Sequence, residues 1–106
     1  MNKYRSHNCN ELRKQSVGKE VILSGWINKK RDHGNLLFID LRDNYGITQC
    51  IIDKENSSFN DLEKMQLETV ILIEGTVVDR SKETINYEIQ TGEIEVVIQN
   101  FKLLGT

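Results

Sequence analysis

The chain has 106 residues, of which 38% are hydrophobic and 28% charged, and it contains no proline. A chain of this length buries only about 60 to 70% of the surface that its unfolded form exposes, which is enough for one modest core. The length therefore excludes a large enzyme with a separate cofactor domain. We expect residues 1–106 to form one domain.

The composition also bears on the cellular compartment. The longest apolar runs, such as residues 70–73, are far shorter than the roughly 18 to 20 residues that a membrane span requires, and the amino terminus lacks the pattern of a signal peptide. Cys9 and Cys50 belong to no CxxC pair, so they indicate neither a disulfide framework nor a zinc site. We expect a cytoplasmic protein that contacts no membrane.

The net charge of −2 hides an uneven distribution. Residues 1–31 hold eight basic and two acidic side chains, a net charge of +6, so residues 32–106 carry −8. A basic amino-terminal third favours a polyanionic partner at one end of the domain, although lysines that serve only solubility give the same pattern.

Alternation of apolar and polar residues predicts strands in most of the chain. The first strand spans residues 21–28, and its apolar face consists of Val21, Leu23, Gly25 and Ile27. Residues 36–43 form the second strand, with Phe38 pointing outward. After a turn at 44–46, residues 47–52 pair back, with Gln49 on the face opposite Cys50.

Helices are expected at 10–15 and, more strongly, at 58–67, where Ser58 is a candidate cap and positions 59, 62 and 65 are apolar. A fourth strand follows over 69–80, kinked or bulged at Gly75. Residues 81–92 are expected to form a loop. The fifth strand spans 93–103, and its inward residues are Ile94, Val96 and Ile98.

This order of elements predicts an all-β fold. Five short alternating strands, with a helix between the third and the fourth, are typical of a Greek-key barrel of the oligonucleotide/oligosaccharide-binding type, the OB-fold. An SH3-like barrel and an open five-stranded sandwich are the alternatives. The position of the helix favours the OB-fold.

The sequence contains no set of residues with the spacing of a known catalytic motif. His7 and His33 are the only histidines, and no glycine pattern matches a phosphate-binding loop or a nucleophile elbow. Acidic pairs such as Glu93 with Glu95 are residues two apart on a strand, which share a solvated face. We expect no catalysis by this chain alone and no metal or cofactor within it.

A binding constellation is present. Trp26, Phe38 and Gln49 all fall on outward faces, beside a basic loop over 28–35. Single-stranded bases are bound by such parts, because aromatic rings stack on bases, amides read their edges and cations neutralise phosphates. The alternative interpretation is structural: Trp26 in the core, Phe38 closing one end of the barrel, and a merely solvated hairpin tip.

The same residues resemble a known family. The segments WINKKRDHG at 26–34, LFIDLRD at 37–43, YGITQC at 45–50 and TGEIEV at 91–96, together with Asn86, look like the amino-terminal domain of bacterial-type aspartyl-tRNA synthetase. The resemblance spans essentially the whole chain. It implies an OB-fold barrel that binds the anticodon loop of a tRNA.

The resemblance also implies roles for single residues. Phe38 would stack on the central anticodon uridine and Gln49 would bind its edge. Arg31 would contact the third base or a neighbouring phosphate, and Glu95 would accept hydrogen bonds from a guanine at the first position. Further candidates for anticodon contact are Asn86 and Trp26.

Two positions are linked to the choice between tRNAs. Histidine at His33 resembles members of the family that charge both aspartate and asparagine tRNAs, and Glu83 occupies the other position connected with this choice. The residues at 83 and 84 match neither pattern of the family. Dual specificity and specificity for aspartate tRNA therefore both stay open.

The resemblance implies a parent enzyme of class II that activates aspartate with ATP and Mg²⁺ and works as a dimer through its catalytic domain. The isolated domain would be a monomer. The alternatives are a free-standing protein that binds single-stranded nucleic acid and a barrel whose outward aromatic residues meet another protein.

Overall fold

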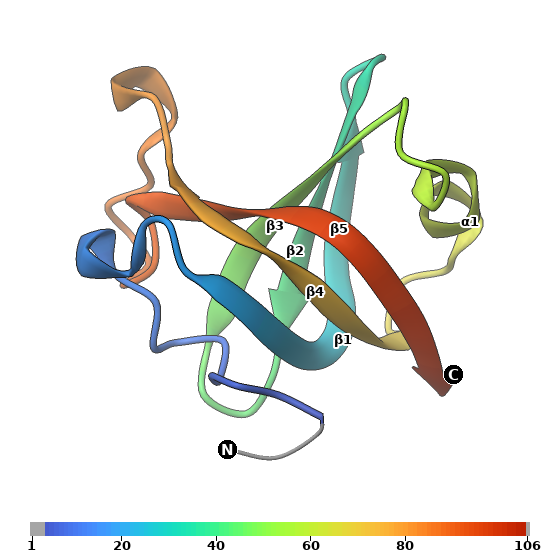
Figure 1. Ribbon diagram of the computed structural model, residues 1–106, viewed down its shortest axis with the longest axis horizontal. Coiled ribbons are helices and arrows are strands. Elements are labelled where there is room, and N and C mark those ends of the chain that lie inside the picture. Colours follow the sequence, from blue (N-terminus) through green and yellow to red (C-terminus); the bar gives the residue numbers. More distant parts are fainter. Residues whose placement is uncertain (1–3, 106) are drawn as a thin grey trace.

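The computed structural model describes residues 4–105, so Lys3, which was counted in the basic third of the chain, lies outside the described residues. The strands are β1 (Glu20–Asp32), β2 (Leu36–Arg42), β3 (Ile47–Asp53), β4 (Val70–Asp79) and β5 (Ile94–Gly105). They close into a barrel in the order β1-β2-β3-β5-β4 (Figure 1). All neighbouring strands are antiparallel except β3 and β5. The five-stranded OB-fold prediction is confirmed.

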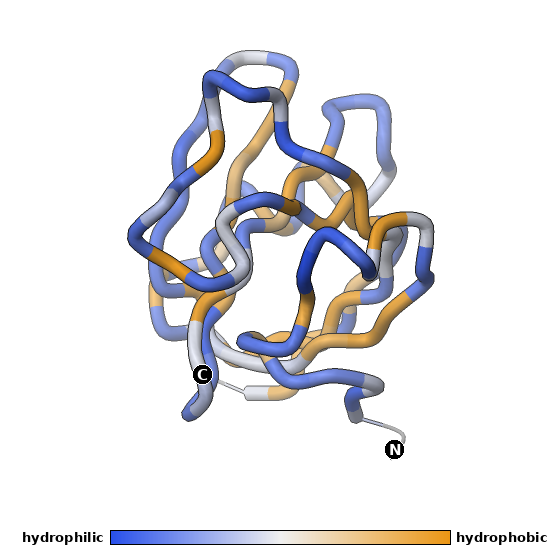
Figure 2. Tube along the Cα trace, turned by 90° about the vertical axis from the view of Figure 1, so that its left-hand side faces the viewer, coloured by the Kyte–Doolittle hydropathy of each residue, from blue (hydrophilic) through white to orange (hydrophobic). Residues whose placement is uncertain are grey.

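The core lies inside the barrel and is made by the predicted alternating faces. Val21, Leu23 and Ile27 of β1 are buried, as are Ile94 and Val96 of β5. The loops that project from the barrel are mainly hydrophilic (Figure 2). Burial of one face of each strand is what the two-residue period of the sequence requires.

Strand β1 is longer than predicted. It continues to Asp32, so Lys29, Lys30 and Arg31 lie on a strand and not in a loop. Its pairing with β2 shifts register between Ile27 and Lys29. This irregularity interrupts the alternation at the position where the sequence pattern predicts the strand to end.

The irregularity expected at Gly75 is present, but the extra residue is Gln99 on the paired strand β5 and not a residue of β4. Strand β4 changes register with β5 between Glu74 and Gly75. A Cβ atom at Gly75 would lie 2.3 Å from the carbonyl oxygen of Val97, so this close approach requires glycine.

Helix α1 (Phe59–Lys64) lies between β3 and β4, as predicted, but it is shorter than residues 58–67. Ser58 occupies the N-cap position, as expected, but its side chain makes no capping hydrogen bond. Phe59 and Leu62 are buried in the core. At the end of the helix, Nζ of Lys30, on β1, donates hydrogen bonds to the carbonyl oxygens of the last turn and of Met65, which lack partners within the helix.

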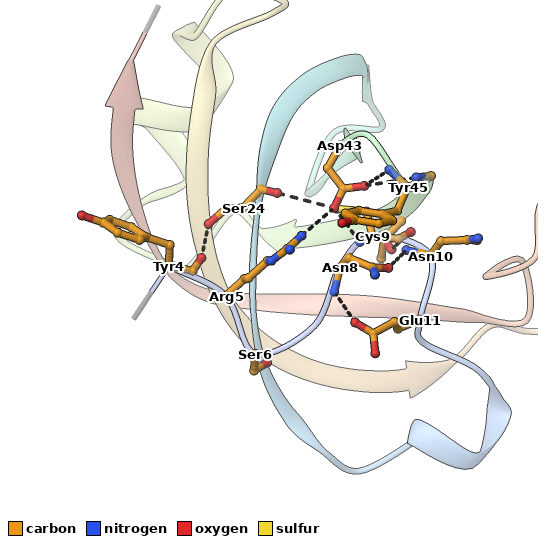
Figure 3. A network of polar contacts seen from close by, with 12 residues as sticks. Tyr4, Arg5, Ser6, Asn8, Cys9, Asn10, Glu11, Ser24, Asp43 and Tyr45 are labelled. Carbon is orange, nitrogen blue, oxygen red and sulfur yellow. Dashed lines mark hydrogen bonds and ion pairs between the residues drawn. The ribbon is translucent and has the colours of Figure 1, made fainter. Parts of the chain in front are cut away.

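The amino-terminal segment is held by Asp43 in the β2–β3 turn (Figure 3). The Cys9 N–H donates to Asp43 Oδ2 at 2.8 Å, and Asp43 Oδ1 accepts from the backbone N–H groups of Tyr45 and Gly46. The helix expected over 10–15 is a 3-10 turn, η1 (Lys14–Ser16). These side-chain hydrogen bonds to the backbone hold residues 8–12 in a non-helical path.

The β4–β5 loop contains a second 3-10 turn, η2 (Lys82–Thr84), within the predicted loop 81–92. Among residues 4–105, the structure contains no helix with the length and apolar character needed to cross a membrane.

Candidate nucleic-acid interface

One pocket of about 180 Å³ contains four of the site residues predicted from the sequence. It is lined by Arg31, His33, Phe38, Gln49 and Thr84. These residues come from β1, the β1–β2 loop, β2, β3 and η2, respectively. The pocket therefore lies on the outer face of the barrel, between the β1–β2 and β4–β5 loops, where OB-folds bind oligonucleotides.

Phe38 forms the aromatic wall of this pocket. Its side chain is half-buried, as expected for a residue that points outward and is partly covered. The His33 ring meets it edge to face, with centroids 5.0 Å apart. The Arg31 guanidinium carbon lies 5.9 Å from the Phe38 centroid, within the range of a cation–π contact. One aromatic face is thus supported by its neighbours and can stack on a base.

A chain of polar contacts runs beside Phe38 across four strands. The Arg31 guanidinium donates to both Asp40 carboxylate oxygens, at 3.2 and 3.3 Å, and its Nη2 donates to Gln49 Oε1 at 2.9 Å. Gln49 Nε2 then donates to Glu95 Oε1 at 2.8 Å. We call Asp40, Arg31, Gln49 and Glu95 the polar relay. It brings three predicted site residues together.

Gln49 is more enclosed than its outward position suggests. Only 7% of the residue is exposed, although it lies on the outer face of β3. Arg31 and Glu95 contact its amide from the neighbouring strands. A buried amide has to keep its hydrogen bonds, so the orientation of Gln49 is specified by its partners.

Arg80 at the end of β4 was missed by the sequence analysis. It is 8% exposed, and it donates from Nε to the Ile94 carbonyl oxygen and from Nη1 to the Thr84 carbonyl oxygen. Burial lowers the pKa of its guanidinium, while the carboxylates of Glu95 and Asp40 raise it. Arg80 therefore ties η2 to β5 beneath the pocket. No motif in the sequence distinguishes a buried arginine from an exposed one.

Four predicted site residues do not line the pocket: Glu95, which belongs to the polar relay, and Trp26, Asn86 and Glu83. Trp26 lies five positions before Arg31 on β1, roughly 16 Å along the strand at about 3.3 Å per residue. Asn86 is exposed, and its side-chain oxygen accepts from the Glu88 N–H at 2.9 Å. Glu83 is also exposed and precedes Thr84, which does line the pocket.

The three consecutive cations on β1 have different surroundings. Lys29 is exposed. Lys30 is engaged by the end of α1, and burial lowers the pKa of its ammonium group. Arg31 is engaged by the polar relay. Lys29 is thus the cation of this run whose charge is turned to solvent.

The described residues offer little for catalysis. Within 4–105, no three His, Cys, Asp or Glu side chains group as a metal site. Cys9 and Cys50 are buried free thiols, and burial raises the pKa of both. A nucleophilic cysteine needs a lowered pKa, so these thiols suit packing and not catalysis.

Comparison with known proteins agrees with this architecture. Residues 21–104 match the family model described as the OB-fold nucleic acid binding domain. The match covers most of the chain, so the protein belongs to the family of OB-fold nucleic acid binding domains.

Within that class, its relatives are ligases. The chain is 73% identical to Aspartate–tRNA(Asp/Asn) ligase from Pelagibacter ubique (strain HTCC1062), over 100% of this chain and 18% of the relative. It is 52% identical to the ligase of the same name from Wolbachia sp. subsp. Drosophila simulans (strain wRi), over 97% of this chain and 17% of the relative. The chain thus spans less than a fifth of the length of these relatives.

Solved structures share the fold. Asparaginyl-tRNA synthetase from Pyrococcus horikoshii superposes with a TM-score of 0.78 at 24% identity, over 94% of this chain and 23% of that one. An OBody bound to hen egg-white lysozyme superposes with a TM-score of 0.82 at 19% identity, over 100% of this chain and 98% of that one. At these identities the likeness concerns the barrel alone.

Proposed function

We propose that this chain is the anticodon recognition module of an aspartate–tRNA ligase. The observation that carries the proposal is the pocket in which Phe38 supplies a stacking face beside the amide of Gln49. The high identity to ligases named for aspartate and asparagine tRNAs supports it.

Phe38 and Gln49 take the central base of the anticodon. A uracil stacked on Phe38 turns its edge toward Gln49, which still has one amide hydrogen and one oxygen lone pair unused by Arg31 and Glu95. Stacking of one base on an aromatic ring contributes about 1 to 3 kcal/mol.

The residues around this pair take the neighbouring bases. Glu95 accepts hydrogen bonds from the donors on the edge of a first-position guanine, and a carboxylate there disfavours phosphate. Arg31 contacts the third base or the phosphate beside it. Asn86, on the β4–β5 loop, and Trp26, further along β1, extend the surface that meets the RNA.

The third base distinguishes aspartate from asparagine anticodons, and His33 is the residue that we assign to tolerate both. It is exposed at the rim of the pocket and packs against Phe38. Glu83, in η2 on the opposite side, is the second residue assigned to this choice. The relatives named for both tRNAs support dual specificity.

The rest of the reaction belongs to the longer protein that the relatives represent. We assign to it the activation of aspartate with ATP and Mg²⁺, the transfer to tRNA and dimerisation, all in the cytoplasm. No step of that chemistry uses residues of this chain, which we expect to be monomeric by itself.

Binding of a short RNA tests this function. The chain is titrated with an aspartate-type anticodon stem-loop and with an unstructured RNA of the same length and composition, by fluorescence anisotropy. If the chain is an anticodon module, it binds the stem-loop at least about tenfold more tightly than the unstructured RNA. Equal binding of both RNAs would favour the free-standing single-strand binder, and binding of neither would contradict an RNA function.

A further inference from the structure

The amide of Gln49 is held between groups of opposite character. Its oxygen accepts from the Arg31 guanidinium at 2.9 Å, and its nitrogen donates to the Glu95 carboxylate at 2.8 Å. Guanidinium is only a donor and ionised carboxylate only an acceptor. Turning the amide by 180° would set donor against donor and acceptor against acceptor. Gln49 is therefore restricted to one orientation.

Arg31, the partner of the amide oxygen, is itself held in place. Asp40 accepts from two nitrogens of the Arg31 guanidinium, at 3.2 and 3.3 Å. Two parallel contacts define the plane of a guanidinium as well as its position. Water does not readily replace these bonds, because Gln49 is only 7% exposed.

A fixed amide displays a fixed order of donor and acceptor to the pocket. Uracil presents a ring N–H donor beside a carbonyl acceptor, whereas cytosine presents a ring nitrogen acceptor beside an amino donor. A glutamine that rotates freely matches either base by turning over. A glutamine locked in one orientation matches only one of them.

We propose that Arg31 and Glu95 are positioning residues that lock the Gln49 amide and thereby make the pocket select uracil over cytosine. The inference rests on the proposed function, because it assumes that Gln49 meets the central base. It adds a role to these two side chains beyond any contact of their own with the RNA.

Glu95→Gln tests whether Glu95 helps to hold the Gln49 amide in one orientation, because glutamine has nearly the same shape as glutamate. A glutamine at position 95 accepts or donates, so the variant removes one of the two restraints on the Gln49 amide. Arg31 still donates to the amide oxygen, so the two amides can turn over together only in the double variant Glu95→Gln with Arg31→Gln. The variant is titrated with two stem-loops that differ only in a central uracil or cytosine. Both carry an abasic first position, which removes the proposed contact between Glu95 and the first base.

We expect the wild-type chain to prefer uracil by about tenfold or more. Glu95→Gln should lose part of that preference, and the double variant Glu95→Gln with Arg31→Gln should lose most of it, through tighter binding of the cytosine RNA. Glu93→Gln is the matched control, since Glu93 is an exposed carboxylate two residues earlier that lies outside the polar relay. It removes the same charge and should keep the preference. Gln49→Ala sets the lower limit of discrimination.

The outcomes separate the two proposals. If the wild-type chain prefers uracil and the double variant Glu95→Gln with Arg31→Gln keeps the full preference, the lock is wrong and the proposed function stands. If the wild-type chain binds neither RNA or does not discriminate, the proposed function fails. A merely structural role of Glu95 would weaken both RNAs equally and leave their ratio unchanged, which also contradicts the lock.

Arg31→Gln supplies a second variant in case Glu95→Gln does not fold, as judged by circular dichroism. It removes the hydrogen bond to the oxygen of the Gln49 amide. The ratio of the affinities for the uracil and cytosine RNAs should therefore fall. A readout without RNA is the side-chain amide resonance pair of Gln49 in a ¹⁵N spectrum. We expect protection from solvent exchange in the wild-type chain and its loss in either variant; unchanged protection would overturn the proposal.

Discussion

His33 packs the edge of its ring against Phe38, with the two ring planes at 68°. A residue at the rim of the pocket is thus in contact with the aromatic side chain that we assign to the central base. The contact gives His33 a defined position beside the proposed base-binding face of Phe38, although His33 lies in a loop.

Replacing His33 by leucine should change the choice between RNAs. Leucine removes the polar ring atoms that we assign to the third base, so we expect weaker binding of an asparagine-type stem-loop by about 1 kcal/mol relative to the aspartate type. Anisotropy titrations of both RNAs measure the difference. If the ratio of the two affinities is the same in the variant and the wild-type chain, His33 has no role in tRNA discrimination.

The strands and the core were predictable because burial inside a barrel leaves a two-residue period in the sequence. Strand β2 and the inward residues of β5 follow this period throughout. The ends of other elements were not predictable. The carbonyl oxygens at the end of α1 are bound by Lys30, a side chain from β1 that no local pattern connects with the helix.

The site was predictable in composition and not in geometry. Phe38 and Gln49 were found from their outward register, and the structure places both in one pocket. The enclosure of Gln49 depends on side chains that lie 18 and 46 positions away. Pattern analysis likewise grouped Trp26 with the site, although the pairing of β1 sets it well along the barrel.

The salt dependence of RNA binding should depend on Lys29 more than on Arg31. Lys29 is exposed, whereas the charge of Arg31 is already paired with Asp40. We expect Lys29→Ala to reduce the slope of log K against log salt by about 0.7 to 1. Lys102→Ala, near the far end of β5, is the control for the loss of one charge. Equal slopes for wild type and Lys29→Ala would show that Lys29 contacts no phosphate.

Gly25→Ala should destabilise the barrel. A Cβ atom at Gly25 would lie 2.3 Å from the carbonyl oxygen of Arg42 on the paired strand β2. Backbone has to move to relieve this contact, which costs about 1 to 3 kcal/mol in the free energy of unfolding. Urea titration measures the loss. Gly105→Ala, where no atom lies within 4 Å of the added Cβ, should be close to neutral.

Stability should fall at alkaline pH because of the two buried thiols. Burial raises the pKa of Cys9 and Cys50 in the folded state, so the unfolded chain ionises first, at about pH 8.5. Above that pH the folded state binds more protons, and the free energy of unfolding decreases by up to about 1.4 kcal/mol per pH unit for each thiol. Urea titrations between pH 7 and 10 measure the trend. Cys50→Ala should show a shallower decline, and a decline as steep as that of the wild-type chain would assign it to other groups.

The central claim is that Phe38 stacks on the middle base of an anticodon. The most direct measurement is a cycle that combines Phe38→Ala with removal of that base from an aspartate-type stem-loop, followed by anisotropy. We predict that Phe38→Ala weakens binding of the intact RNA by about 1 to 3 kcal/mol and has almost no effect on the RNA that lacks the base. An equal loss with both RNAs, or no loss with either, would contradict the account.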